Sequence, residues 1–342
     1  MTDEIKDMFD FLLIDSKPIY SLEGCAQAVK EQRPYLDDED SEEYIGAIEG
    51  LIERFRTGVY LCNEDELAFL QSATEMTEAK LPWKDNVKFY PFRIFAFNHF
   101  AFVFHHENEL HLILPTELIV EYRKIIAEEN FAQVNVRNRD LFTYATGLIN
   151  LYGAYETEHF ADVWNHHRKD KITVKEAETF LSDRAYFNSD YYFVDGFIVH
   201  DCLFEDDFDE LFDATYNMEY YIPTKSVIRA YAKKGYDGVE TDGLKEIQDL
   251  LAEFIKDENI LDDLPHELRQ ACERLKSPYE VRNMLEEAGA PINNTTFCEK
   301  FERLYNNLRN NVHVWELRGH LPHQYQAATG KSVTRFTFPK GE

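Results

Sequence analysis

The sequence lacks the patterns that mark membrane proteins, secreted proteins and the common enzyme families. It has no run of eighteen apolar residues, so we expect no transmembrane helix. Its first residues, MTDEIKDMFDFLLIDSK, have neither the basic start nor the apolar stretch of a secretory signal, and we therefore expect a cytoplasmic protein. No nucleophile-elbow, zinc-protease or dinucleotide-binding motif is present. These absences favour a protein that is not an enzyme.

Cysteine and histidine offer little for a metal site. The five cysteines are odd in number and far apart, with no C-x-x-C, which supports neither a disulfide framework nor a cysteine zinc site. Four of the twelve histidines, His99, His105, His106 and His111, lie within thirteen residues. Strand alternation places His99 and His105 on one face and His106 on the other, so the imidazoles do not converge. We expect no bound metal and no cofactor.

What the chain has in quantity is aromatic residues and acid. Aromatic residues make up 14% of the chain, which excludes global disorder. The formal net charge is -28, yet residues 299–342 hold seven Lys or Arg against four Asp or Glu, a local balance of +3 that leaves -31 for the rest. The basic residues of this segment, in an otherwise acidic chain, favour contact with an acidic partner. The acidic remainder would repel DNA, so we expect nucleic acid not to be the main partner.

The apolar pattern predicts a mainly helical α+β protein of three domains. An N-terminal α+β domain is expected at 1–135, a winged-helix-like module at 136–210 and a C-terminal helical domain at 211–342.

The N-terminal domain is predicted to combine helices with a β-hairpin. Residues 8–13 have helical apolar spacing, and the acidic run 37–43 leads into an amphipathic helix that ends near Phe55. Two apolar runs within 92–114, separated by a polar turn at 106–109, predict the hairpin, and a helix should begin near Pro115.

The middle module is predicted from three helical segments followed by a hairpin. The third helix has a capping box at Thr173 and Glu176, and Asp195-Gly196 suits a type I′ turn. This is the element order of a winged-helix module. The third helix, counting Lys175 and Arg184 as exposed, has no excess of basic residues, which favours a structural or protein-binding role over DNA reading.

The C-terminal domain is predicted to be a helical bundle. Its last long helix should carry an apolar stripe from Phe297 to Trp315, begin with a capping box at Thr296 and Glu299, and end at Gly319. The later segment ATGKS resembles the end of a phosphate-binding loop, but Tyr325 occupies the first glycine position of that motif, so we expect a surface turn.

The segment NNVHVWELRGHLPHQY, residues 310–325, has the most distinctive residue choices. It resembles the NNTR-x-W-x-x-R-G-H-T-P-x-E pattern of bacterial proteins of the SEC-C-motif-associated type, many of which carry a cysteine-rich zinc tail. The resemblance covers about sixteen residues closely. It departs from the pattern at Val312, His313 and Leu321, and no cysteine follows Cys298, so the tail is missing from this chain. The resemblance implies a bacterial protein and no particular activity.

The candidate interaction residues within this segment are Trp315, Arg318, His320 and His323. They can form a turn that anchors the last helix, with Arg318 bonded to helix-end carbonyls, or a recognition surface for an acidic partner. We expect the structural role, and we expect the whole protein to be an adaptor or regulator that binds another protein. The alternatives are a nucleic-acid-associated regulator that uses the middle module and the basic tail, an acidic DNA mimic, and an undetected hydrolase.

Overall fold

The computed structural model describes residues 13–32, 38–75, 95–96, 98–107, 109–187, 191–234, 241 and 243–339. The described residues form fourteen α-helices and two three-stranded sheets, a mainly helical α+β fold as predicted. The chain divides into two compact units, Met1–Leu141 with Tyr186–Asn188 and Phe142–Ala185 with Ser189–Glu342. Among the helices described, none has the length and apolar character needed to cross a membrane.

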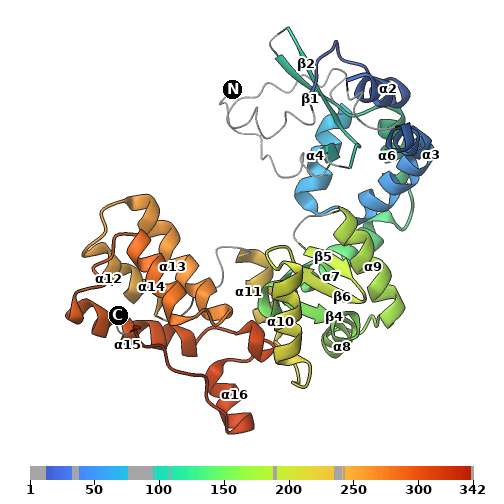
Figure 1. Ribbon diagram of the computed structural model, residues 1–342. Coiled ribbons are helices and arrows are strands. Elements are labelled where there is room, and N and C mark those ends of the chain that lie inside the picture. The colour runs from blue at the N-terminus through green and yellow to red at the C-terminus, as the bar shows by residue number, and fades with distance from the viewer. Residues whose placement is uncertain are drawn as a thin grey trace. The chain divides into compact units, whose positions relative to one another are not determined.

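The first unit packs helices around a small sheet. Strand β2 pairs with β1 in parallel and with β3 in antiparallel, so Val103 lies between Leu13 and Leu112. Helices α2, α3 and α6 pack against one another beside the sheet (Figure 1). The elements are β1 (Leu13–Ile14), α2 (Leu22–Gln32), α3 (Asp38–Leu61), α4 (Glu64–Glu75), β2 (Phe102–His106), β3 (Glu109–Ile113), α6 (Thr116–Ile126) and the first part of α7 (Phe131–Tyr152).

The predicted hairpin and the helix after Pro115 are confirmed, while two local predictions in this unit are wrong. Leu13, expected at the end of a helix, begins β1, because a parallel partner distant in sequence is available at β2; residues 8–12 of that expected helix lie outside the described residues. His99, expected on a strand, precedes β2 in a turn with φ 58°. The histidines are also held separately, since His105 bonds to Asp15 at 3.0 Å and His111 is buried.

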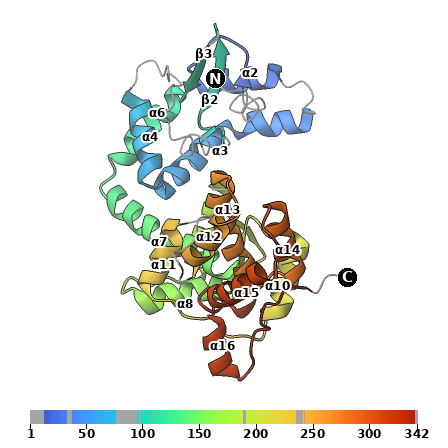
Figure 2. The ribbon, with the colours of Figure 1, turned by 90° about the vertical axis from the view of Figure 1, so that its left-hand side faces the viewer.

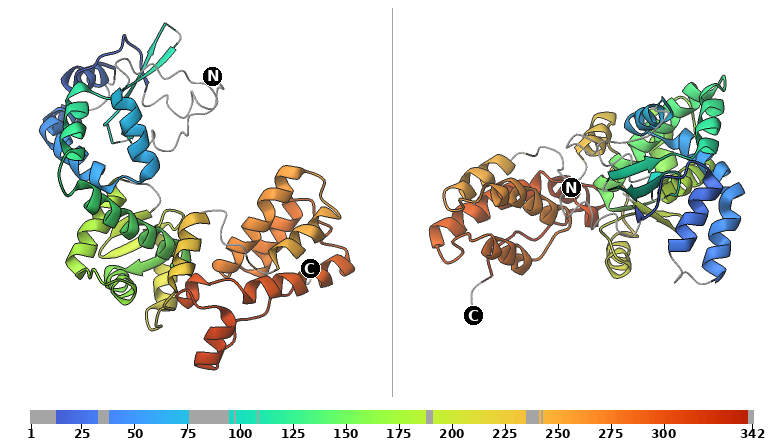
Figure 3. Two further views of the ribbon diagram at one scale, coloured as in Figure 1. Left: turned by 180° about the vertical axis from the view of Figure 1, so that it is seen from behind. Right: turned by 90° about the horizontal axis from the view of Figure 1, so that it is seen from above.

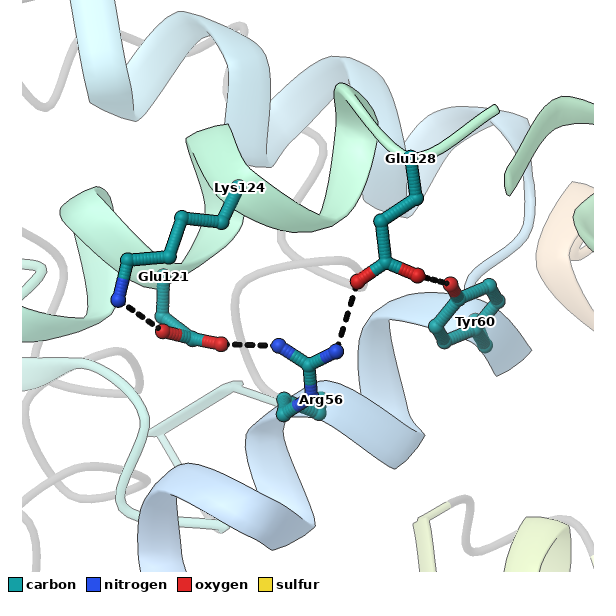
Figure 4. Close-up of polar contacts among 5 residues, drawn as sticks. All are labelled: Arg56, Tyr60, Glu121, Lys124 and Glu128. Carbon is teal, nitrogen blue, oxygen red and sulfur yellow. Dashed lines mark hydrogen bonds and ion pairs between the residues drawn. The ribbon is translucent and has the colours of Figure 1, made fainter. Parts of the chain in front are cut away.

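A polar network joins α3 to α6 and to the residues that follow it (Figure 4). The Arg56 guanidinium donates to Glu121 and, at 2.7 Å, to Glu128. Lys124 donates to the second oxygen of Glu121 at 2.9 Å, and the Tyr60 hydroxyl donates to Glu128. The hydrogen bond from Lys124 and that from Arg56 outweigh burial and lower the pKa of Glu121, and hydrogen bonds from Tyr60 and Arg56 lower the pKa of Glu128.

Replacing Arg56 by methionine should destabilise the first unit by about 1 kcal/mol at neutral pH, since its side chain is 32% exposed and the ion pairs are partly screened. A glutamate whose pKa is lower in the folded than in the unfolded chain stabilises the fold at a pH above its unfolded pKa of about 4.3. This stabilisation is lost as the pH falls through the pKa of the folded state. The difference in the free energy of unfolding between parent and variant should therefore become smaller below about pH 4. Urea unfolding at pH 7 and at lower pH, with the exposed Lys17→Met as control, measures both effects. A penalty that stays constant with pH would contradict this account.

The first part of the second unit has the helices and the hairpin that the sequence predicts, with one additional strand. They are the rest of α7, β4 (Ala154–Glu156), α8 (Thr157–His167), α9 (Val174–Phe187), β5 (Tyr191–Val194) and β6 (Phe197–His200). The strand order is β4-β6-β5, with both pairs antiparallel. Asp195 and Gly196 both have positive φ, as a type I′ turn requires, and the capping box of Thr173 and Glu176 is formed.

The exposure expected for Arg184 on α9 is wrong. Its side chain is fully buried, with the guanidinium 4.0 Å from the centroid of the Phe142 ring. Lys175 is thus the exposed cation of α9, beside the exposed carboxylates of Glu176, Glu178 and Asp183.

The second part of this unit is helical, and four of its helices form a bundle with one core. Helices α12 to α15 lie side by side (Figures 2 and 3), and their apolar faces meet around Leu268, Leu285 and Phe301. The elements of this part are α10 (Glu205–Thr215), α11 (Lys225–Lys234), α12 (Leu244–Ala252), α13 (Glu258–Glu273), α14 (Pro278–Glu287), α15 (Thr295–Asn310), the 3-10 turn η2 (Trp315–Leu317) and α16 (Pro322–Thr329).

Helix α15 begins and ends differently from the prediction. The Asn294 side chain accepts from the amides of Thr296 and Phe297, so it caps the helix in place of the expected Thr296–Glu299 box. The helix ends at Asn310, and Trp315 belongs to η2 and packs with Val199, Leu203 and Leu211. Gly319 closes the 3-10 turn rather than α15.

Candidate functional site

Residues 314–320 form a tight turn built around two residues with positive φ, Arg318 and Gly319. The amide of Gly319 donates to the Val314 carbonyl at 2.9 Å, and the Val314 amide donates to the carbonyl of His320 at 3.2 Å. Gly319 faces Tyr152 so closely that a Cβ there would lie 2.5 Å from the ring. The R-G-H sequence thus supplies a turn that a residue with a side chain at 319 could not make without displacing a buried tyrosine.

Arg318 points inward and is enclosed by polar and aromatic partners. Its guanidinium pairs with Glu156 at 3.1 Å and lies 4.2 Å from the centroid of the Tyr220 ring. The imidazole ring of His159 stacks on the ring of Tyr220, with ring centroids 3.8 Å apart. Burial, with the Arg318 charge second, lowers the pKa of His159 to about 3, so its imidazole is neutral at pH 7. Arg318 thus pairs with the carboxylate of Glu156 on β4, and not with helix-end carbonyls as the sequence predicted.

The other three candidate residues are not gathered at one place. The Trp315 indole donates to the Asn150 carbonyl at 3.2 Å and is buried. His320 and His323 lie near the surface, where their ring nitrogens contact the carbonyls of Glu219 and Asn310 at 3.2 and 3.1 Å. Trp315 and Arg318 thus face the interior, and the two histidines contact different main-chain segments.

Arg318→Ala and His320→Ala should differ in stability. Loss of Arg318 leaves Glu156 without its guanidinium partner and should cost about 2 kcal/mol, since Glu156 is partly exposed and water can replace some of the lost interaction. Loss of His320 should change the free energy of unfolding by less than about 0.5 kcal/mol. Chemical unfolding of both variants decides this, and a parent-like stability of Arg318→Ala would show that the turn does not depend on the Arg318–Glu156 ion pair.

A cavity of about 160 Å³ is lined by Trp315, by the end of β6 and the residues that follow it, and by α13. It is lined by residues far apart in the chain, including His200, Cys202, Arg269, Glu273, Arg274 and Trp315. Arg269 and Glu273 form an ion pair at 2.5 Å, and both are almost completely buried. Arg274 lies 5.0 Å from the centroid of the Trp315 ring and donates to the Cys202 sulfur at 2.6 Å.

The electrostatics of this cavity favour anionic or electron-rich groups. Burial acts to lower the pKa of His200, but its bonds to Asp201 and Cys202 and their negative charges outweigh burial and raise the pKa to about 9. At neutral pH the cavity thus contains the cations His200, Arg269 and Arg274 against the carboxylates of Asp201 and Glu273.

A metal ion is disfavoured at the same place. His200, Asp201 and Cys202 offer ligand atoms within 4.8 Å of one another. However, the guanidinium of Arg274 contacts the sulfur, and a metal ion would have to displace a proton from His200, whose pKa is raised. Absence of metal stays a prediction, which elemental analysis of the dialysed protein checks.

An aromatic stripe runs along α10, a helix that the sequence pattern did not predict. The aromatic stripe consists of Phe204, Phe208, Phe212 and Tyr216, spaced four residues apart and therefore on one face. Phe208 and Phe212 contact Phe197 of the hairpin, each with ring centroids 5.5 Å apart. Phe204 and Tyr216, at the two ends, are 77% and 60% exposed. The two ends of the stripe are therefore open to solvent.

A groove of about 640 Å³ beside α15 is basic, as the C-terminal charge balance suggested. We name it the arginine groove, after Arg303, Arg309 and Arg335 in its lining. The segment after α16 is held there by Arg309, which donates to the Thr334 carbonyl at 3.1 Å, and by Asn306, which bonds to Phe336. The segment ATGKS, predicted to be a surface turn, begins in the last residues of α16, and Gly330 with φ 72° ends that helix.

Comparisons of the chain with family models, curated proteins and solved structures found no match. The resemblance of residues 310–325 to SEC-C-motif-associated proteins stays a prediction. The cavity and the aromatic stripe were missed in the sequence. The stripe had a usable signal, since four aromatic residues at intervals of four indicate a helix face, whereas the cavity residues come from five separate segments and share no motif.

Proposed function

We propose that the protein is a non-catalytic cytoplasmic adaptor or regulatory protein that binds a basic segment of another protein through α10. The aromatic stripe is the observation that carries this proposal. Its two exposed ends, Phe204 and Tyr216, have the size and rigidity of the aromatic anchors that dominate protein interfaces, where one buried ring can contribute several kcal/mol.

The negative charge around the aromatic stripe favours a basic partner. Residues 201–224 contain eight Asp or Glu and no Lys or Arg. Asp206, Asp207, Asp209, Glu210 and Asp213 are all exposed on the same helix as the stripe. Apolar anchors bordered by carboxylates suit a basic amphipathic helix, whose apolar residues cover the rings while its Lys and Arg pair with the acids.

The proposal is tested with a double variant that keeps the acids. Phe204→Ser with Tyr216→Ser removes both exposed rings, and Tyr279→Ser is the matched control, since Tyr279 is 64% exposed and belongs to another helix, α14. Proteins captured from native cells by the parent chain are identified, purified and measured for affinity to all three forms. We expect a basic partner whose affinity falls at least tenfold in the double variant, is unchanged in the control, and weakens with salt.

Equal affinity of the double variant and the control would overturn the proposal. A captured partner that is acidic, or one whose binding is insensitive to salt, would also contradict it, because the carboxylates around the stripe could not then be the attracting groups.

A nucleic-acid-associated regulator is the second candidate, supported by two observations. The sheet order β4-β6-β5 with α7, α8 and α9 supports the winged-helix-like interpretation of the middle module, and the arginine groove supplies cations. Against this, α9 presents one lysine among three carboxylates, and a reading helix needs basic and amide groups.

Fluorescence anisotropy with duplex and single-stranded DNA separates the two candidates. We expect no submicromolar binding near about 150 mM salt. Submicromolar binding that is lost in Arg303→Glu would move the function to the arginine groove, and binding lost in Lys175→Glu would move it to α9.

A further inference from the structure

We propose that residues 333–337 are an open strand edge to which an acidic, extended segment of another protein adds beside the arginine groove. This second interaction surface is independent of the partner-binding role of α10. It is carried by the way α15 holds these residues, by their unpaired main-chain groups, and by the charge of the groove.

The first observation is that α15 holds one edge of this segment as a neighbouring strand would. Side chains of α15 bond to the main chain of every second residue, Thr334, Phe336 and Phe338. Asn306 accepts from the Phe336 amide and donates to the Phe336 carbonyl, both at 2.9 Å. A period of two residues is that of a β-strand, in which successive residues turn their amide and carbonyl groups to opposite edges. The rings of Phe336 and Phe338 also pack against the bundle core, which fixes the segment on α15.

The second observation is that the opposite edge is unpaired. Among the described residues, no hydrogen bond reaches the amide or carbonyl groups of Val333, Arg335 and Thr337. By the alternation of the segment, these groups turn away from the edge that α15 holds. The residues Arg335 and Thr337 are exposed. An unpaired edge of this kind presents donors and acceptors at the spacing of an extended peptide, which can add to it as a further strand.

The charge beside this edge favours an acidic segment. Val333, Thr334 and Arg335 line the arginine groove, so the edge and the groove are adjacent. Three arginines and no Asp or Glu are among the residues that line the groove. Arg303 and Arg335 are exposed, and each is therefore accessible to a carboxylate of an added strand. In a chain with a net charge of -28, this local excess of cations gives the complementarity that selects an acidic partner.

The same features disfavour two other occupants. The phosphates of a nucleic-acid backbone offer acceptors only, so they leave the outward carbonyls of residues 333, 335 and 337 without donors, and the groove lining has no aromatic residue on which bases stack. In a second copy of this chain, antiparallel pairing of the segment with itself places Arg335 opposite Arg335, and like charges at opposed positions destabilise a strand pair. A peptide of opposite charge has neither fault.

Fluorescence anisotropy with a labelled eight-residue peptide of alternating glutamate and valine tests the charge. We expect saturable binding to the full chain that weakens with salt. Arg303→Glu with Arg335→Glu should lower the affinity at least about tenfold. The matched control is Lys169→Glu with Lys175→Glu, which changes the net charge equally at two exposed residues outside the groove and should stay within about twofold of the parent.

A change in the peptide alone tests the strand pairing and leaves the protein unaltered. Two versions of the peptide carry N-methyl groups, one on all valines and the other on all glutamates. Methylation removes the donors from one edge of the peptide, so at least one version should bind about tenfold more weakly than the unmodified peptide.

Failure of the acidic peptide to bind the parent chain would overturn the proposal, as would equal affinities in the arginine and lysine double variants. Parent-like affinity for both methylated peptides would show that the main-chain edge is not used. A single-stranded oligonucleotide that binds more tightly than the peptide, and loses binding in the arginine double variant, would assign the groove to nucleic acid instead.

Discussion

Trp315→Ala is expected to destabilise the second unit by about 3–5 kcal/mol, the range for a buried aromatic replaced by alanine. The indole is buried against Val199, Leu203 and Leu211 and bonded to the Asn150 carbonyl, so its removal leaves a cavity and an unpaired acceptor. A Cβ at Gly153 would lie 2.4 Å from the indole ring, so the backbone at this position packs directly against Trp315.

Chemical unfolding followed by circular dichroism measures this loss, with the exposed Tyr279→Ala as control. The control should change by less than about 0.5 kcal/mol. If Trp315→Ala unfolds at the same denaturant concentration as the control, the turn does not anchor the unit, and Trp315 would have to be reassigned to an interface.

Gly319→Ala should cost about 2–5 kcal/mol, from two additive causes. The left-handed backbone, φ 75°, costs an alanine about 1–2 kcal/mol, and overpacking against Tyr152 costs about 1–3 kcal/mol. Tyr152 cannot move aside easily, since it is buried and its hydroxyl donates to the Tyr221 carbonyl at 2.7 Å.

Gly330→Ala is the matched control because Gly330 has nearly the same φ, 72°, with no atom within 4 Å of the added Cβ. The control should show the backbone cost alone, about 1–2 kcal/mol. Equal penalties for the two glycines in unfolding experiments would mean that the contact with Tyr152 contributes nothing, and the packing of the R-G-H turn would need another explanation.

Local signals in the sequence predicted local structure well. The type I′ turn at Asp195-Gly196 and the capping box of Thr173 and Glu176 are confirmed because each depends on residues adjacent in the chain. The Thr296 capping box is wrong for the same kind of reason, since Asn294 lies two residues earlier and is the stronger cap.

Features set by long-range packing could not be predicted. Strand β1 exists because Leu13 pairs with Val103, and nothing near Leu13 indicates that partner. Arg184 has the composition of an exposed helix residue but is buried over Phe142. The cavity joins Cys202 to Arg274, and Trp315 to Asn150, across distances in sequence that no motif spans. The three-domain division and the role of residues 310–325 in recognition stay predictions.

The central claim is that α10 is the partner-binding surface. Hydrogen–deuterium exchange of the chain, with and without its purified partner, tests it most directly, because it locates the contact without any substitution. We expect slower exchange upon binding in residues 204–216 and in the β5–β6 hairpin, with the arginine groove unchanged. Protection confined to residues 303–335, with α10 exchanging as in the free protein, would contradict the claim.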